Sequence, residues 1–174
     1  MIMNLIPQDH QLLKTNLEPF DFKNPPIDPV ELTETMIENL EHYRGLGLSA
    51  NQIGLPYRVF VINTQPEKLV CFNPEITFAS EEMKVITEGC LTFPSLYVKI
   101  RRPSLIRAKF FDQTGEIKTM KLDDIIGRCY QHELDHLNGV DYLSRATPYH
   151  LSQSKRKAKI INRKIKKMQR AVGA

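Results

Sequence analysis

The spacing of hydrophobic positions along the chain predicts three helices. Apolar residues recur at helical intervals over Pro29–Tyr43, where acidic residues dominate the opposite face. A second periodic stretch runs from about Asp123 to Asn138 and ends at Gly139, a residue type that commonly terminates helices. A third runs from about Pro148 to Ala171, where one apolar stripe is surrounded by lysines and arginines. The stripe consists of Leu151, Ser154, Ala158, Ile161, Ile165 and Met168.

Short runs rich in Val, Ile, Phe and Tyr predict the strands. Four of them are Arg58–Asn63, Leu69–Phe72, Tyr97–Arg101 and Leu105–Phe111, and a turn signal at residues 112–115 predicts a hairpin between the last and Glu116–Leu122. No repeat, linker or domain break is apparent. Few helices, several antiparallel strands and no strand–helix alternation predict an α+β fold in one domain spanning residues 1–174. We expect the strands to pack around the second helix, with the third helix at the C-terminus.

Composition indicates an ordinary globular protein. The 174 residues are 41% hydrophobic and 25% charged, and no apolar run approaches the roughly 20 residues of a membrane span. The N-terminal residues lack the basic start and apolar core of a secretory signal. Three cysteines, Cys71, Cys90 and Cys129, cannot all pair within one chain, which favours a reducing cytoplasm.

The net charge of +4 hides an asymmetry. All 20 acidic residues lie at or before Asp141, whereas residues 142–174 hold ten lysines and arginines and no acid. Nine of these ten fall between Lys155 and Arg170, on the predicted third helix. A block of one sign suggests an anionic partner such as nucleic acid, and the alternative is a helix docked on its own domain with a solvated basic face.

The second predicted helix carries the sequence His132-Glu133-Leu134-Asp135-His136. At 3.6 residues per turn, the two histidines project from one face and can bind one metal ion, while Glu133 can act on a water molecule there. Asp135 falls on a different face, where a buried ion pair with an arginine is plausible. The alternative is a solvated helix with two unrelated histidines.

Two histidines need a third ligand to form a catalytic site. Metalloproteases with this pattern take either a downstream acid or a histidine six residues after the second one. Here no acid follows Asp141, and that last position is Tyr142. Cys90 remains, because a thiolate is a strong ligand for soft or borderline divalent ions. A lone cysteine is otherwise more often a buried apolar thiol.

Three blocks of sequence together resemble the motifs of the peptide deformylase family. They are Gly45-Leu46-Gly47-Leu48-Ser49-Ala50-Asn51-Gln52, Glu88-Gly89-Cys90-Leu91-Thr92 and Gln131-His132-Glu133-Leu134-Asp135-His136. The family motifs are usually written G-φ-G-φ-A-A-x-Q, E-G-C-φ-S and Q-H-E-x-D-H, where φ is apolar. This chain departs at Ser49, where the family usually has Ala, and at Thr92, where it usually has Ser.

The resemblance implies hydrolysis of the N-formyl group from the formyl-methionine of new polypeptides, with release of formate. The implied metal ligands are Cys90, His132 and His136, and the implied general base is Glu133. The implied donors to the oxyanion are the backbone N–H of Leu91 and the side-chain amide of Gln52. An alternative role for Gln52 is that of a loop amide that satisfies backbone groups.

The resemblance also implies a substrate cleft in which Gly47 lies beside the substrate backbone. The expected cleft and methionine-pocket residues are Leu46, Gly47, Glu88, Gly89, Ile125, Cys129 and His132. Ile125 and Cys129 are equally consistent with an ordinary core position. Arg102, at the end of a predicted strand that could border the cleft, is more ordinarily explained as a surface charge, because arginine is mostly exposed. Arg128 is expected either at the cleft rim or in solvent.

One cysteine and two histidines fit iron, zinc, cobalt or nickel, and the resemblance implies Fe²⁺ in the cell. The expected partners are formyl-methionyl nascent peptides and, through the basic helix, ribosomal RNA. A monomer without membrane association is expected. Two other functions are a metalloprotease and a ribosome- or RNA-binding protein with a vestigial metal site.

Overall fold

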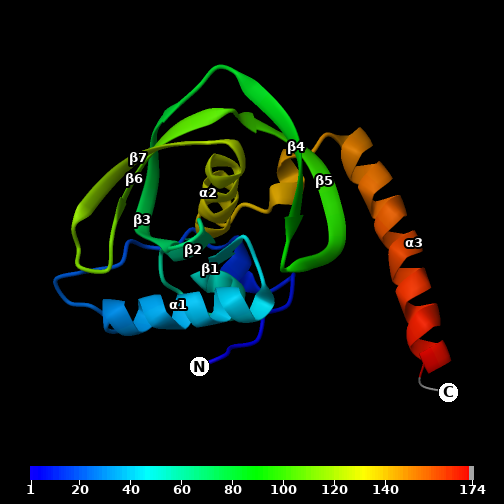
Figure 1. The fold of residues 1–174 in the computed structure, drawn as a ribbon, viewed down its shortest axis with the longest axis horizontal. Coiled ribbons are helices and arrows are strands. Elements are labelled where there is room, and N and C mark those ends of the chain that lie inside the picture. The colour runs from blue at the N-terminus through cyan, green and yellow to red at the C-terminus, as the bar shows by residue number, and fades with distance from the viewer. Residues whose placement is uncertain (173–174) are drawn as a thin grey trace.

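The computed structural model describes residues 1–172, with side chains up to Gln169, so the side chain of Arg170 and residues 173–174 lie outside the described part. In chain order the elements are η1 (Gln11–Lys14), α1 (Pro29–Tyr43), β1 (Gly47–Ser49), η2 (Ala50–Ile53), β2 (Val59–Asn63), β3 (Lys68–Ala79), β4 (Met83–Cys90), β5 (Phe93–Pro103), β6 (Leu105–Phe111), β7 (Ile117–Asp123), α2 (Asp124–Leu137), η3 (Tyr142–Arg145) and α3 (Pro148–Val172). Helix α2 lies at the centre, between the sheets, and α3 stands to one side against β5 (Figure 1).

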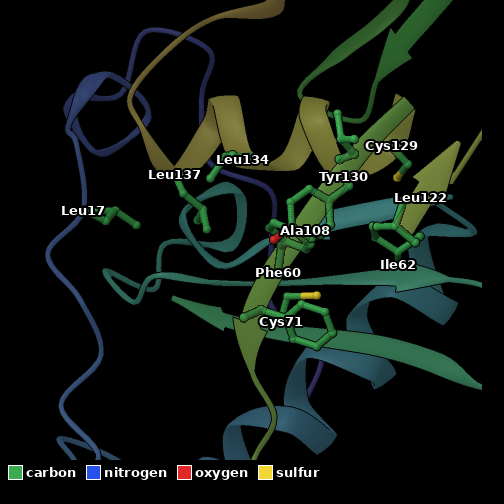
Figure 2. Close-up of a cluster of buried hydrophobic side chains, with 12 residues drawn as sticks. Leu17, Phe60, Ile62, Cys71, Ala108, Leu122, Cys129, Tyr130, Leu134 and Leu137 are labelled. Atoms are coloured by element: carbon green, nitrogen blue, oxygen red, sulfur yellow. The ribbon is translucent and has the colours of Figure 1, made fainter. Parts of the chain in front are cut away.

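The strands form two antiparallel sheets, which confirms the predicted α+β class. One sheet has five strands in the order β1-β2-β3-β6-β7, and the other is the β4–β5 pair. One face of α2 packs on the larger sheet through an apolar cluster (Figure 2). The Tyr130 ring of α2 lies edge-on to Phe60 of β2, with centroids 4.9 Å apart. Burial of this face fixes the opposite face of α2 toward the β4–β5 pair.

Capping residues at both ends define the limits of helix α1. The Asp28 carboxylate accepts hydrogen bonds from the backbone N–H groups of Val30 and Glu31, and Pro29 occupies the first turn. At the other end Arg44 adopts a left-handed conformation with φ of 53°, which stops the helix. The chain then turns directly into β1, so α1 delivers this short strand to the side of α2.

All three predicted helices and the β6–β7 hairpin are confirmed. The hairpin pairs Leu105 with Asp123 through to Phe111 with Ile117. Sequence reasoning missed β1, which has only three residues, and β4, whose buried and exposed positions do not alternate regularly. It also predicted β3 and β5 too short: the structure extends β3 to Ala79 and begins β5 at Phe93, and both added segments contain a proline, which is uncommon within strands.

Only the first turns of α3 dock on the domain. Leu151 packs against the cluster formed by Val98, Ile100 and Tyr142. Ser154 and Ala158 are half-buried, and the outer end of the expected stripe is exposed, with Ile161 at 41%, Ile165 at 43% and Met168 at 69%. The stripe therefore does not bury its full length, because the helix runs past the end of β5 (Figure 1). Among the described residues, no helix combines the length and apolar character needed to cross a membrane.

Candidate metal centre and active site

Helix α2 and the end of β4 bring three metal-ligating side chains together. His132 and His136 lie one turn apart on α2, with ring centroids 5.0 Å apart. The Sγ atom of Cys90 lies 3.2 Å from Nε2 of His136. One ligand atom from each of the three residues lies within 4.8 Å of the others. The fold thus assembles the thiol and imidazole groups that the sequence predicted as one site.

The donor set fits a divalent metal ion. Sulfur and nitrogen donors suit iron, zinc, cobalt and nickel. Burial, with the adjacent His132, lowers the pKa of His136 well below its usual range, so this ring is neutral, as a ligand must be. Nδ1 of His132 lies 3.0 Å from the Glu88 carboxylate, which leaves Nε2 as the nitrogen for a cation.

Glu88 is the centre of a buried ion network. Its carboxylate accepts hydrogen bonds from Nε of Arg102 at 2.7 Å and from Nη1 of Arg128 at 3.1 Å, and it contacts His132. Arg102 is 3% exposed, so its expected surface position was wrong, and Arg128 is buried rather than at the rim or in solvent. Burial of the two guanidinium groups is tolerated because the carboxylates of Glu88 and Asp135 compensate their positive charges.

Asp135, also on α2, joins the same network. It accepts hydrogen bonds from Arg102 and from Nε of Arg145, each at 2.6 Å. The buried ion pair expected for Asp135 is therefore present. Arg145 was not singled out from the sequence, because it lies in the short element η3 and no motif marks it.

Glu133 is buried beside the three candidate ligands, with 3% of its surface exposed. Its Oε2 atom has no hydrogen-bond partner within the described structure. Burial raises the pKa of the Glu133 carboxyl to about 7. A carboxylate that is desolvated, unpaired and close to a metal centre has the properties of a general base.

Gln52 and Leu91 lie at the same centre. The Gln52 carbonyl oxygen accepts hydrogen bonds from the backbone N–H of Ser49 at 2.9 Å and from the Ser49 hydroxyl at 3.0 Å. Its amide nitrogen donates to the Thr92 hydroxyl at 3.0 Å and lies 3.5 Å from Cys90 Sγ. The amide oxygen of Gln52 thus accepts from a backbone N–H group, which was the alternative role expected from the sequence. The amide nitrogen faces the metal centre.

A cavity of about 460 Å³ opens over these groups. All the expected cleft residues line it, but Glu88 does so with a carboxylate already held by arginines, and Ile125 is 52% exposed at the mouth. Cys129 lines the cavity and also belongs to the core cluster of Figure 2, so it has both the cleft position and the core position considered from the sequence. Sequence reasoning missed one wall of the cavity, the segment Phe93–Tyr97. Its apolar residues directly after the Cys90 block were the available signal.

Gly47 is a point of close approach between β1 and α2. A Cβ atom at this position would lie 2.4 Å from Oε1 of Glu133 and 2.5 Å from Sγ of Cys129. Only glycine leaves room for both side chains while keeping the β1 backbone at the cavity wall. Gly47 therefore lies beside the cleft as expected, and steric contact with Glu133 and Cys129 explains why this position is a glycine.

Comparison with known proteins agrees with this geometry. The family model of polypeptide deformylase matches residues 2–152. The chain belongs to the peptide deformylase family. Members of this family are metalloenzymes that remove N-formyl groups from nascent peptides. Most of α3 lies beyond the matched range.

Individual peptide deformylases support the assignment. A relative from Bartonella tribocorum is 41% identical over an alignment 125 positions long, and the match covers 66% of this chain and 70% of the relative. One from Prochlorococcus marinus is 40% identical over 67% of this chain and 61% of its own length. The crystal structure of the Thermotoga maritima peptide deformylase has a TM-score of 0.79 and 34% identity, covering 85% of this chain and 99% of that one. An Acinetobacter baumannii enzyme crystallised with bound Met-Ala-Ser has a TM-score of 0.77 and 25% identity, covering 83% of this chain and 98% of its own.

Proposed function

We propose that this protein is an active peptide deformylase that removes the formyl group from the N-terminal formyl-methionine of newly synthesised polypeptides and releases formate. The observation that carries the proposal is the convergence of Cys90, His132 and His136 beside the buried Glu133. Three of these four side chains, Cys90, His132 and Glu133, line one cavity. His136 lies next to them, with its Nε2 atom 3.2 Å from Cys90 Sγ.

Cys90, His132 and His136 would hold a divalent metal, which supplies a water of lowered pKa and polarises the formyl carbonyl when bound. Glu133 accepts the proton from the attacking water and later delivers it to the leaving amine nitrogen. Its burial and its unpaired Oε2 support this assignment, because a desolvated carboxylate binds a proton readily.

The carbonyl oxygen becomes an oxyanion, for which Leu91 and Gln52 are the proposed donors. An amide nitrogen carries two hydrogens. Thr92 accepts one from Gln52, and the other is directed at Cys90 Sγ at 3.5 Å, where an oxyanion formed beside Cys90 would accept it instead. The backbone N–H of Leu91, next to Cys90 in the chain and also at the cavity, would supply the other hydrogen bond.

The methionine side chain of the substrate would enter the apolar part of the cavity, between Leu46, Ile125 and Cys129, with Glu88 and Gly89 opposite. The backbone of Gly47 in β1 would lie beside the substrate backbone. The Met-Ala-Ser peptide bound by the A. baumannii enzyme has the sequence of a deformylated product, and we infer the same substrate class here.

Formate release from formyl-Met-Ala-Ser by the metal-loaded protein tests the proposal. We expect turnover by the natural protein and loss of about 1,000-fold in kcat for Glu133→Ala, with metal content unchanged. Cys90→Ser is expected to weaken metal retention instead. Full activity of Glu133→Ala would show that the base is misassigned, and no turnover by the natural protein would exclude the function.

We propose Fe²⁺ as the metal in the cell, with Zn²⁺, Ni²⁺ or Co²⁺ possible after purification. A thiolate ligand to iron is open to oxidation, so activity is expected to fall in air. Metal analysis of protein purified without oxygen tests this proposal. Zinc in place of iron in such a sample would contradict it.

We further propose that the protein acts as a monomer in the cytoplasm and contacts ribosomal RNA through α3. The basic helix extends beyond the domain with exposed cations, as expected for a contact with phosphate. Ribosome binding of the full chain and of a chain ending at His150, measured over a salt series, tests this contact. Equal and salt-insensitive binding would contradict it.

The structure offers no support for the metalloprotease alternative, because Tyr142 is engaged elsewhere. Tyr142, at the position of a third histidine in one protease motif, donates its hydroxyl to the carbonyl oxygen of Leu96 at 2.8 Å. A purely RNA-binding protein with a vestigial site has no need of a complete set of ligands and base. Both alternatives therefore account for less of the structure than deformylation does.

A further inference from the structure

A second groove lies beside the catalytic cavity, between α3 and the turn of the β4–β5 pair. Its volume is about 410 Å³. Phe93, Pro94 and Leu96 line both the groove and the cavity. The two spaces are therefore neighbours that share one short segment of chain as a wall, which we call the ridge (residues 93–96).

The other wall of the groove is strongly basic. Lys155, Lys159, Arg163 and Lys166 line it from α3. They recur at intervals of three or four residues and so project from one face of the helix. All four are exposed, and none forms an ion pair within the described residues. The groove thus presents four exposed positive charges beside the apolar residues of the ridge, and Gln8, Ala158 and Asn162 complete its lining.

The other cations of α3 whose side chains are described do not line this groove. Lys157 and Lys164 are exposed on the same helix, outside the groove. The helix therefore has a basic face toward the ridge that is distinct from its outer basic face. Contact with RNA through the outer face leaves the groove face open to another ligand.

We propose that this groove binds acidic side chains of the substrate polypeptide downstream of the residues held in the cavity. This rests on the proposed deformylase function. A cavity of about 460 Å³ is of the size that encloses a small-molecule ligand, so a nascent chain leaves it after its first residues. The ridge is a shared border, and a chain that crosses it meets the basic face. Lys155 to Lys166 span about 16 Å of helix, which equals roughly five residues of extended peptide.

The inference predicts a sequence preference that short peptides do not reveal. Nascent chains with acidic residues several positions after the methionine would be deformylated faster than neutral ones, and basic ones more slowly. The effect acts through charge attraction at a solvated surface, so it raises kcat/KM at low salt and vanishes as salt screens the groove.

The test compares formyl-Met-Ala-Ser extended by blocks of about five glutamates, glutamines or lysines, placed directly after serine or about four residues later. For the natural protein at low salt we expect kcat/KM to be about 3- to 10-fold higher for the glutamate than for the glutamine peptide at one of these positions. About 0.5 M salt is expected to abolish the difference.

Two double variants with equal change of charge separate the groove from general electrostatics. Lys159→Glu with Arg163→Glu is expected to abolish or reverse the preference for the glutamate peptide. Lys157→Glu with Lys164→Glu, on the outer face, is expected to keep most of it. Equal rates for the glutamate and glutamine peptides with the natural protein, or equal loss in both variants, would overturn the proposal.

Direct binding separates this proposal from the function on which it rests. Fluorescence anisotropy of the labelled product peptide Met-Ala-Ser followed by five glutamates reports groove binding without turnover. Tighter binding than the glutamine peptide, lost in the groove variant, supports the proposal even if no formate is released. If the groove variant loses ribosome binding but keeps the peptide preference, the groove belongs to RNA and the proposal fails.

Discussion

The Ser49 hydroxyl lies 3.0 Å from the carbonyl oxygen of Gln52, and both side chains are fully buried. The Ser49 backbone N–H donates to the same oxygen at 2.9 Å. Thr92 accepts from the other end of the amide. The two positions at which this chain departs from the usual family motifs are thus the two that hold the Gln52 side chain in orientation.

Ser49→Ala is therefore expected to loosen Gln52 while leaving the fold intact. Loss of one neutral hydrogen bond corresponds to about 1 kcal/mol, or roughly 5-fold in kcat, with KM and metal content unchanged. Gln52→Ala alone is expected to cost about 100-fold. The decisive measurement is the double variant: in the Gln52→Ala background, Ser49→Ala is expected to have no further effect, and additive losses would exclude a positioning role.

Gly47→Ala is expected to disturb the reaction more than the fold. The added methyl group would meet the Glu133 carboxylate and the Cys129 thiol at distances below contact. A displacement of about 1 Å in a catalytic group can cost about 100-fold in rate. Steady-state kinetics, thermal unfolding and metal analysis of the variant check this together. Unchanged kcat would mean that Glu133 moves freely and is not held in place.

Glu88→Gln is expected to weaken metal binding and stability at once. The substitution removes the anion beside Nδ1 of His132 and leaves Arg102 and Arg128 with less compensation. We expect metal affinity to fall by about 10- to 100-fold and unfolding free energy by about 3 kcal/mol. Chelator competition and denaturant unfolding measure the two effects. Glu82→Gln, in an exposed acid of the adjacent loop, is the control and is expected to change neither.

The β6–β7 turn predicts a defined acid dependence of stability. Slight burial acts to raise the pKa of Asp112, but hydrogen bonds from Thr114 and Lys118 lower it to about 2. A lowered pKa stabilises the fold above the unfolded value of about 4, and this contribution is lost as pH falls toward about 2. The difference in unfolding free energy between the natural protein and Asp112→Asn is therefore expected to be larger at about pH 5 than at about pH 2.5.

Urea unfolding at the two pH values checks the prediction. Asp9→Asn, at an exposed acid with no ion pair among the described residues, serves as the control and is expected to show no such dependence. An equal difference at both pH values for Asp112→Asn would contradict the assignment.

Much of the site could be predicted because short sequence segments contain most of its reactive side chains. The spacing of His132 and His136 on α2, with the exclusion of other third ligands, was enough to bring in Cys90, and the structure places the three together. The β6–β7 turn followed from its Asp and Gly residues in the same way. Local sequence determines these features, so a single chain reveals them.

Other features depend on contacts between distant segments and could not be predicted. Arg102 looks like a surface residue on β5 until Glu88 and Asp135 are placed beside it. The stripe of α3 has the correct period over its whole length, but the domain surface beneath it ends after the first turns. Periodicity shows which face is apolar and not how much surface is available to cover it.

The ion pair between Arg145 and Asp135 limits how far the chain can be shortened from its C-terminus. Arg145 stands in η3, just before α3, and its guanidinium closes the open side of Asp135. A chain that stops at His150 retains this ion pair but loses Leu151, which packs against the cluster of Val98, Ile100 and Tyr142. Metal content of the shortened chain should therefore be measured alongside its ribosome binding. A stop codon before Arg145 would remove the guanidinium group that pairs with the buried Asp135.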